Sequence, residues 1–196
     1  MLAGTARDEW RAFDTVLDDS EITDDFLRDR VRALAGGNDL DVADVLDRYR
    51  SEQTRSRDVA SALVTDFHFA ATTEQFVRAH AARGNPVFHY ELQWDSPRPG
   101  LGACHDTDLP LLFGTMDRVP ALAGTGPQAE AMSKVVQDAW LAFVHSGDPS
   151  TAAIGPWPAY DPDRRPTMLL GPDPRVAERH RSDLLGVWQG RYPVTG

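Results

Sequence analysis

A shortage of β-strands is the feature that most constrains the fold of this chain. Only three short segments have the pattern of strands, at residues 1–4, 87–94 and 167–170, and amphipathic helices fill most of the sequence between them. Three short strands make a poor sheet alone, because they would leave unpaired backbone groups along its edges. The order of elements therefore predicts an α/β fold whose strands belong to a larger sheet.

Four helices are predicted in the first part of the chain from their capping residues and apolar faces. Thr23 precedes two acids and a periodic apolar run, which is typical of a helix N-terminus. Asp41 is expected to cap a second helix, and Ser56 to open a third. Thr72 and Gln75 have the spacing of a capping box in front of a fourth helix.

The hydrophobic period changes to two at residues 87–94, where Phe, Tyr, Leu and Trp alternate with His, Glu and Gln. This alternation predicts a half-buried strand. A loop rich in Pro, Gly and Asp follows over residues 95–110, and another short element is expected at 111–114. The widest apolar stripe predicts a helix over 128–146, and a last helix is predicted over 174–189.

Composition excludes several classes of partner. The 196 residues carry 30 acidic and 20 basic side chains, for a net charge of -10, whereas a nucleic-acid surface or an anionic membrane surface needs a basic patch. The apolar runs are far shorter than the roughly 20 residues that cross a bilayer. Met1–Gly4 lacks the basic and apolar regions of a signal peptide, and the compartment stays open.

Few residues have the spacing that catalysis requires. The six histidines form no HExxH-type pair, and the single cysteine, Cys104, has no partner, so neither a metal nor a cofactor is expected. None of the nine serines stands in a Gly-x-Ser-x-Gly frame. His105 is a candidate because it lies in an irregular loop after a strand, where functional residues concentrate. Glu9, judged alone, has the features of a surface acid.

Several segments resemble type-B carboxylesterases, a family of the α/β-hydrolase superfamily that includes lipases. Residues 4–9, Gly-Thr-Ala-Arg-Asp-Glu, resemble the segment that carries the glutamate of the catalytic triad, and residues 102–114 resemble the histidine segment. Residues 140–149 and 157–162 resemble the family's C-terminal helix end and tail. The matches follow the family's order, in which the acid precedes the histidine.

The resemblance implies that Glu9 orients His105 and that His105 exchanges a proton with a serine during hydrolysis of a small carboxylic ester. Asp108 stands where the family usually has Glu, which is expected to affect loop support. The expected fold is the helix-rich C-terminal part of an α/β-hydrolase, with a few strands of a larger mixed sheet.

Residues 1–196 are accordingly expected to be the C-terminal portion of a hydrolase domain. The serine and the oxyanion hole would lie in an N-terminal portion, which is the expected partner, and the chain alone is expected to be inactive. Two alternatives remain open. One is a non-catalytic binding protein or an inactive remnant with the same fold. The other is an independent α/β domain of unrelated function.

Overall fold

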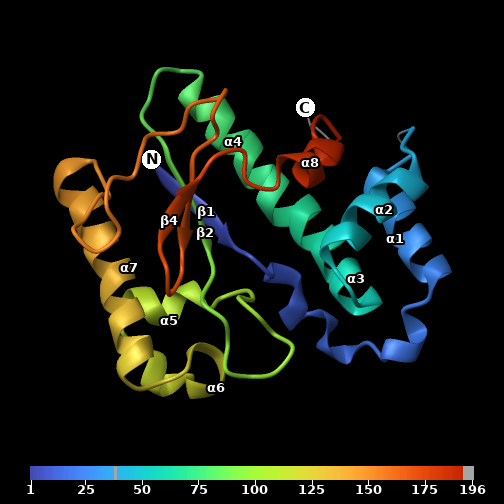
Figure 1. The fold of residues 1–196 in the computed structure, drawn as a ribbon, viewed down its shortest axis with the longest axis horizontal. Coiled ribbons are helices and arrows are strands. Elements are labelled where there is room, and N and C mark those ends of the chain that lie inside the picture. Colours follow the sequence, from blue (N-terminus) through green and yellow to red (C-terminus); the bar gives the residue numbers. More distant parts are fainter. Residues whose placement is uncertain (38, 192–196) are drawn as a thin grey trace.

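A four-stranded mixed sheet lies between two groups of helices (Figure 1). The computed structural model of the chain describes residues 1–37 and 39–191. The strands follow their sequence order across the sheet, with the first three parallel and the last antiparallel. They are β1 (Leu2–Ala6), β2 (Phe88–Leu92), β3 (Thr167–Leu170) and β4 (Arg175–Ala177). The helix-rich α/β class with a small mixed sheet is therefore confirmed.

Helices cover both faces of this sheet. On one face, α7 packs on β2 and β3 in a core that includes Phe88, Tyr90 and Met168. On the opposite face, Val77 of α4 (Ala71–Ala81) packs close to Ala3. The elements on the α7 side are α5 (Asp108–Phe113), η5 (Met116–Arg118), α6 (Pro120–Ala123) and α7 (Pro127–Ser146).

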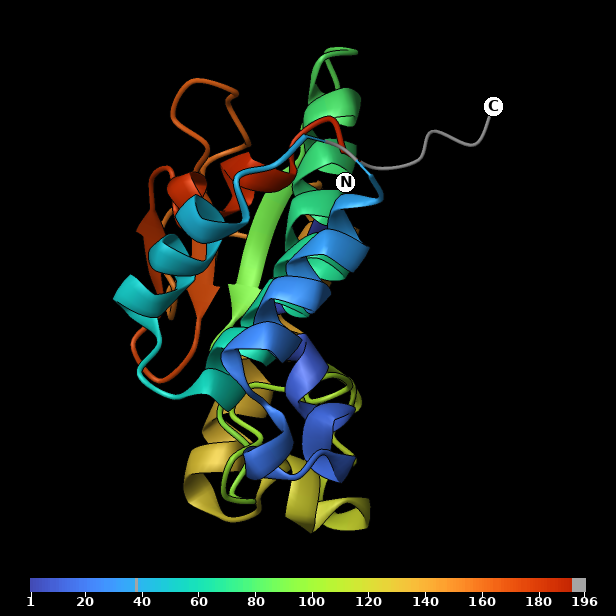
Figure 2. The ribbon, with the colours of Figure 1, turned by 90° about the vertical axis from the view of Figure 1, so that its right-hand side faces the viewer.

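A separate helical core lies beside the sheet and faces the viewer in Figure 2. It is built from α1, α2, α3 and η4, and the last helical turns of the chain complete it. The bounds are η1 (Glu9–Ala12), η2 (Asp14–Val16), η3 (Asp19–Glu21), α1 (Asp24–Ala35), α2 (Val42–Glu52), α3 (Ser56–Thr65), the π-helical turn η4 (Asp66–Ala70), α4 (Ala71–Ala81), α8 (Ser182–Leu185) and η6 (Gly186–Trp188).

Two predicted helix starts, those of α1 and α2, are confirmed by hydrogen bonds from their capping residues. The Thr23 hydroxyl accepts the backbone N–H of Phe26, and the Asp41 carboxylate accepts two N–H groups of the first turn of α2. The capping box predicted at Thr72 is wrong. The chain stays helical from α3 through η4 into α4, and the Thr72 hydroxyl donates to the Phe67 carbonyl at 2.9 Å. The wider π turn lets a hydroxyl reach back in this way.

The last part of the chain also departs from the prediction. The helix expected over 174–189 is replaced by β4 and two short helical turns. Gly171 and Pro172 begin the turn that returns the chain antiparallel to β3, and Val176 packs on the sheet core. Strand pairing with β3 therefore overrides the local helical pattern.

Among the described residues, no helix is long and apolar enough to cross a membrane.

Strand β2 is buried on both faces, which corrects the expected half-buried strand. It lies between two parallel neighbours with helices above and below, as is usual for parallel strands. The polar side chains on its second face are paired: His89 Nδ1 lies 3.2 Å from Thr167 Oγ1, and the Glu91 carboxylate lies 3.1 Å from His180 Nε2. Burial alone would raise the pKa of Glu91, but His180 and Arg181 lower it to about 2.

Buried His89 predicts a loss of stability in mild acid. Burial lowers the pKa of His89 to about 4. As the pH falls from about 6.5 towards 4, the unfolded chain binds a proton that the folded state excludes, so the free energy of unfolding decreases by about 3 kcal/mol. We expect His89→Gln to remove this part of the pH dependence in urea unfolding between pH 4 and 7. The exposed-site control His145→Gln should retain it, and an unchanged slope in His89→Gln would contradict the assignment.

Candidate active site

Glu9 and His105 follow the carboxyl ends of two neighbouring parallel strands. Glu9 begins the turn η1 just after β1, and His105 lies in the loop between β2 and α5. Carboxyl ends of parallel strands meet at the same edge of a sheet, where α/β proteins place their ligand sites. The topology therefore brings together two residues that are 96 positions apart in the sequence.

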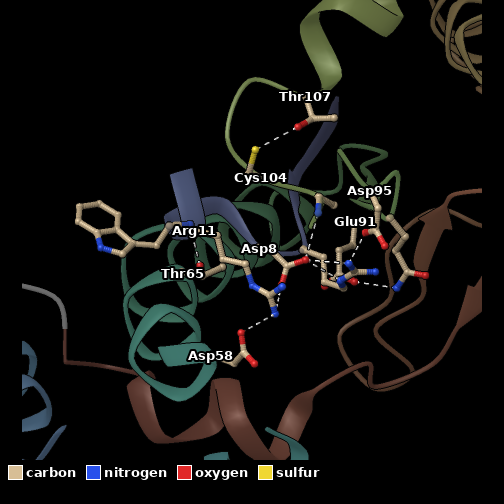
Figure 3. A network of polar contacts seen from close by, with 12 residues as sticks. Asp8, Arg11, Asp58, Thr65, Glu91, Asp95, Cys104 and Thr107 are labelled. Atoms are coloured by element: carbon tan, nitrogen blue, oxygen red, sulfur yellow. Dashed lines mark hydrogen bonds and ion pairs between the residues drawn. The ribbon is translucent and has the colours of Figure 1, made fainter. Parts of the chain in front are cut away.

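A reciprocal pair of hydrogen bonds at Asp8 and Ala103 holds these two segments in register. The Asp8 backbone N–H donates to the Ala103 carbonyl at 2.8 Å, and the Ala103 N–H donates to the Asp8 carboxylate at 3.1 Å. Arg7 pairs with the same carboxylate at 2.7 Å. Arg11 pairs with it at 3.1 Å (Figure 3). These contacts offset the cost of burying the Asp8 charge.

The Glu9 carboxylate is buried and uses both of its oxygens. Oε2 lies 2.6 Å from Nδ1 of His105, and Oε1 accepts the backbone N–H of Ala6 at 2.7 Å. Burial raises the pKa of Glu9, while these two hydrogen bonds act in the opposite direction. The backbone N–H of His105 also donates to the Glu9 carbonyl at 3.3 Å. The carboxylate is thus fixed against the imidazole ring.

This contact determines the roles of the two ring nitrogens of His105. A carboxylate only accepts hydrogen bonds, so Nδ1 is the donor and Nε2 of the neutral ring carries the lone pair. Nε2 lies 3.7 Å from Oδ1 of Asp106, which is beyond hydrogen-bond distance. The His105 side chain is 39% exposed. The arrangement therefore leaves Nε2 of His105 as a proton acceptor, and the Glu9 carboxylate sets the orientation of the ring.

Aromatic rings surround the imidazole on the helical side. The rings of Phe13 and Phe69 each lie 5.4 Å from the His105 ring between centroids. Trp10 packs on Phe13 at 4.7 Å and stacks with His68 at 5.9 Å. Contacts of this kind restrict the tilt of the histidine ring. Trp10 directly follows Glu9 and Phe13 lies four residues after it, and this closeness to the candidate acid is the signal that could have pointed to them.

The surroundings of Cys104 and Asp108, the other candidates in the loop that carries His105, fit a structural role. Cys104 is buried with its sulfur 3.5 Å from Thr107 Oγ1, and burial raises the pKa of the thiol, which disfavours the nucleophilic thiolate. Asp108 begins α5, and burial raises the pKa of its carboxyl group. Among residues 1–37 and 39–191, no group of three His, Cys, Asp or Glu side chains could hold a metal ion.

The sheet order and the helices on both faces of the sheet are those of the α/β-hydrolase fold. A model of the carboxylesterase family matches residues 4–188, so the chain belongs to this family. A solved structure, a carboxylesterase of Geobacillus stearothermophilus, has the same fold, with a TM-score of 0.77 at 24% identity over 96% of this chain and 40% of that chain.

Two curated relatives have sequence similarity over most of the chain. This chain is 30% identical over 175 residues to the para-nitrobenzyl esterase of Bacillus subtilis, and the aligned region covers 87% of this chain and 34% of that protein. It is 26% identical over 145 residues to the liver carboxylesterase of Sus scrofa, covering 70% of this chain and 25% of that protein. The chain therefore spans about a third or less of the length of these relatives.

Gly102 allows a test of the contact between Asp8 and Ala103, which supports the loop that carries His105. Its φ is +59°, and a Cβ at this position would lie 2.3 Å from Oδ2 of Asp8. Gly100 has a φ of +87° with no atom within 4 Å of such a Cβ, which makes it a matched control. We expect Gly102→Ala to lose about 1–3 kcal/mol more unfolding free energy in urea than Gly100→Ala, because only the former must displace Asp8. Equal losses would contradict the structural role of Gly102.

Proposed function

We propose that residues 1–196 form the C-terminal portion of a carboxylic ester hydrolase domain, in which Glu9 and His105 are the acid and base of a Ser-His-Glu triad. The observation that carries the proposal is the 2.6 Å contact between Glu9 Oε2 and His105 Nδ1, with Nε2 left available. Membership of the carboxylesterase family and the names of the relatives support ester hydrolysis as the reaction.

In this proposal His105 acts through Nε2. Nε2 takes the proton of a serine hydroxyl as the serine oxygen attacks the ester carbonyl, and Glu9 stabilises the imidazolium that forms. The imidazolium then returns the proton to the leaving alcohol, which leaves an acyl-enzyme. A water molecule, deprotonated by the same nitrogen, releases the carboxylic acid and regenerates the serine.

Burial of Glu9 favours catalysis over a purely structural pair. A carboxylate loses several kcal/mol of hydration when it is buried, and a surface ion pair with a histidine does not require that cost. Glu9 is only 7% exposed, and both of its oxygens are engaged. A binding protein with the same fold has no need for an oriented and partly exposed imidazole, so the acid–histidine pair supports the enzyme.

The chain alone is proposed to be inactive, because the nucleophile and the oxyanion donors would lie in another portion of the fold. The sequence has no Gly-x-Ser-x-Gly frame among its nine serines. A purified sample should therefore hydrolyse para-nitrophenyl acetate no faster than its His105→Ala variant does. A faster rate that depends on His105 would contradict this part of the proposal.

A chimera tests the triad directly. The N-terminal part of the Bacillus subtilis para-nitrobenzyl esterase, up to the segment that matches this chain, is fused in front of residues 1–196. We expect His105→Ala to reduce kcat for para-nitrophenyl acetate by about 10⁴–10⁶-fold, because the serine loses its base. Glu9→Gln should reduce kcat by about 10⁴-fold, because the imidazole loses its orienting charge.

Matched variants separate catalysis from folding in the chimera. His145 and Glu130 are exposed residues of α7, so His145→Ala and Glu130→Gln should retain the rate of the unmodified chimera. Circular dichroism establishes that each variant is folded. A folded, active chimera whose rate is unaffected by His105→Ala would overturn the assignment.

A further inference from the structure

A pocket of about 390 Å³ opens beside the start of α3 and carries an unusual concentration of arginine. Four guanidinium groups and three carboxylates line it, which gives a net positive charge in a chain whose overall charge is -10. The guanidinium groups are those of Arg11, Arg55, Arg57 and Arg98. We propose that this pocket binds the carboxylate or phosphate group of a small molecule.

The carboxylates of the pocket are already engaged. Asp58 pairs with Arg55 at 2.7 Å and with Arg11 at 3.5 Å, and Asp14 pairs with Arg30 at 3.1 Å. Asp58 therefore holds Arg55 and Arg11 in place at the pocket. The third carboxylate, that of Asp19, contacts Arg57, and Arg30 lies outside the lining. The three carboxylates do not offer free acceptors to a cation.

Arg98 has no such partner. Within the described part of the chain, no carboxylate lies at ion-pair distance from its guanidinium, and the residue is exposed at the pocket. Arg57 also directs its guanidinium to neutral acceptors, the carbonyl oxygens of Asp14 and Leu17, besides its contact with Asp19. The positive charge of the pocket is thus only partly compensated. Guanidinium groups in this situation favour planar oxyanions, which they bind through paired N–H donors.

Ser61 is the second, independent indication of a ligand. It is 1% exposed and lines the pocket, and its hydroxyl has no hydrogen-bond partner among the described residues. An unpaired buried hydroxyl is costly, and a helical serine normally avoids the cost by bonding to a carbonyl one turn back. A hydroxyl can rotate to donate to an oxyanion in the pocket. Ligand binding would therefore satisfy a group that the protein leaves unsatisfied.

The first turn of α3 also borders the pocket. α3 runs over Ser56–Thr65, its N-cap residue Arg55 makes no side-chain cap, and Asp58 supplies one carboxylate in the first turn. Backbone N–H groups at a helix N-terminus favour an anion. The volume of the pocket falls within the range of about 300–1,000 Å³ that is usual for small-molecule sites. Charge, donors and size thus agree on a small oxyanion.

Titration of the 196-residue chain with inorganic phosphate and, separately, with succinate tests the proposal. Amide and guanidinium NMR signals of Ser61 and Arg98 are followed at constant ionic strength. We expect saturable shifts with at least one of the two anions at millimolar concentration, and the anion that binds identifies the group. Arg98→Gln and Ser61→Ala should each weaken binding about 10-fold, as expected when a hydrogen bond to a charged group is lost. Arg118→Gln, an exposed arginine outside the pocket, should bind like the unmodified chain.

The stability of Ser61→Ala provides a second readout that does not require the anion. Because the hydroxyl is unpaired in the free protein, its removal should leave the thermal unfolding midpoint unchanged or raised, while the stabilisation by added anion becomes smaller. Absence of saturable shifts, or binding that is insensitive to Arg98→Gln, would overturn the proposal. These measurements involve no ester hydrolysis, so their outcome is independent of the triad assignment.

Discussion

The reciprocal hydrogen bonds between Asp8 and Ala103 are the constraint on which the candidate site depends. They join two loops that are 95 positions apart, so the acid and the histidine share one rigid frame. Asp8 is itself 8% exposed, and its buried charge would be unstable without the guanidinium groups of Arg7 and Arg11. The 2.6 Å contact of Glu9 with His105 is therefore held by its neighbours as well as by the pair itself.

A second buried ionic network fastens the helical core to the sheet behind this frame. Arg181 of the C-terminal segment lies 2.9 Å from Asp66 of η4 and 3.8 Å from Glu91 of β2. Burial raises the pKa of Asp66, and Arg181 opposes that shift. The network fixes the end of α3, where Thr65 accepts the backbone N–H of Trp10 at 2.9 Å. The buried ion pairs of Arg181 that stabilise the fold thus also help to position Trp10 beside the candidate site.

The sequence predicts features that depend on local chemistry and misses those that depend on distant contacts. Thr23 and Asp41 cap their own helices, and β3 has the predicted bounds of residues 167–170. The helix expected over 174–189 fails because strand pairing with β3 competes with local periodicity. His105 is a candidate from its position in an irregular loop, whereas Glu9 becomes one only through the family resemblance. The catalytic role of both residues stays a prediction.

Arg11 links the candidate active site to the arginine-lined pocket. Its guanidinium lies 3.1 Å from Asp8 and 3.5 Å from Asp58 (Figure 3). Arg11 therefore contacts both the carboxylate that is bonded to Ala103 and a carboxylate that lines the pocket. A charge within a few ångströms of a partly buried guanidinium is only weakly screened by solvent. An anion in the pocket would therefore act on Arg11 and, through it, on the carboxylate that holds Ala103. The two sites share one electrostatic element, although their chemistry differs.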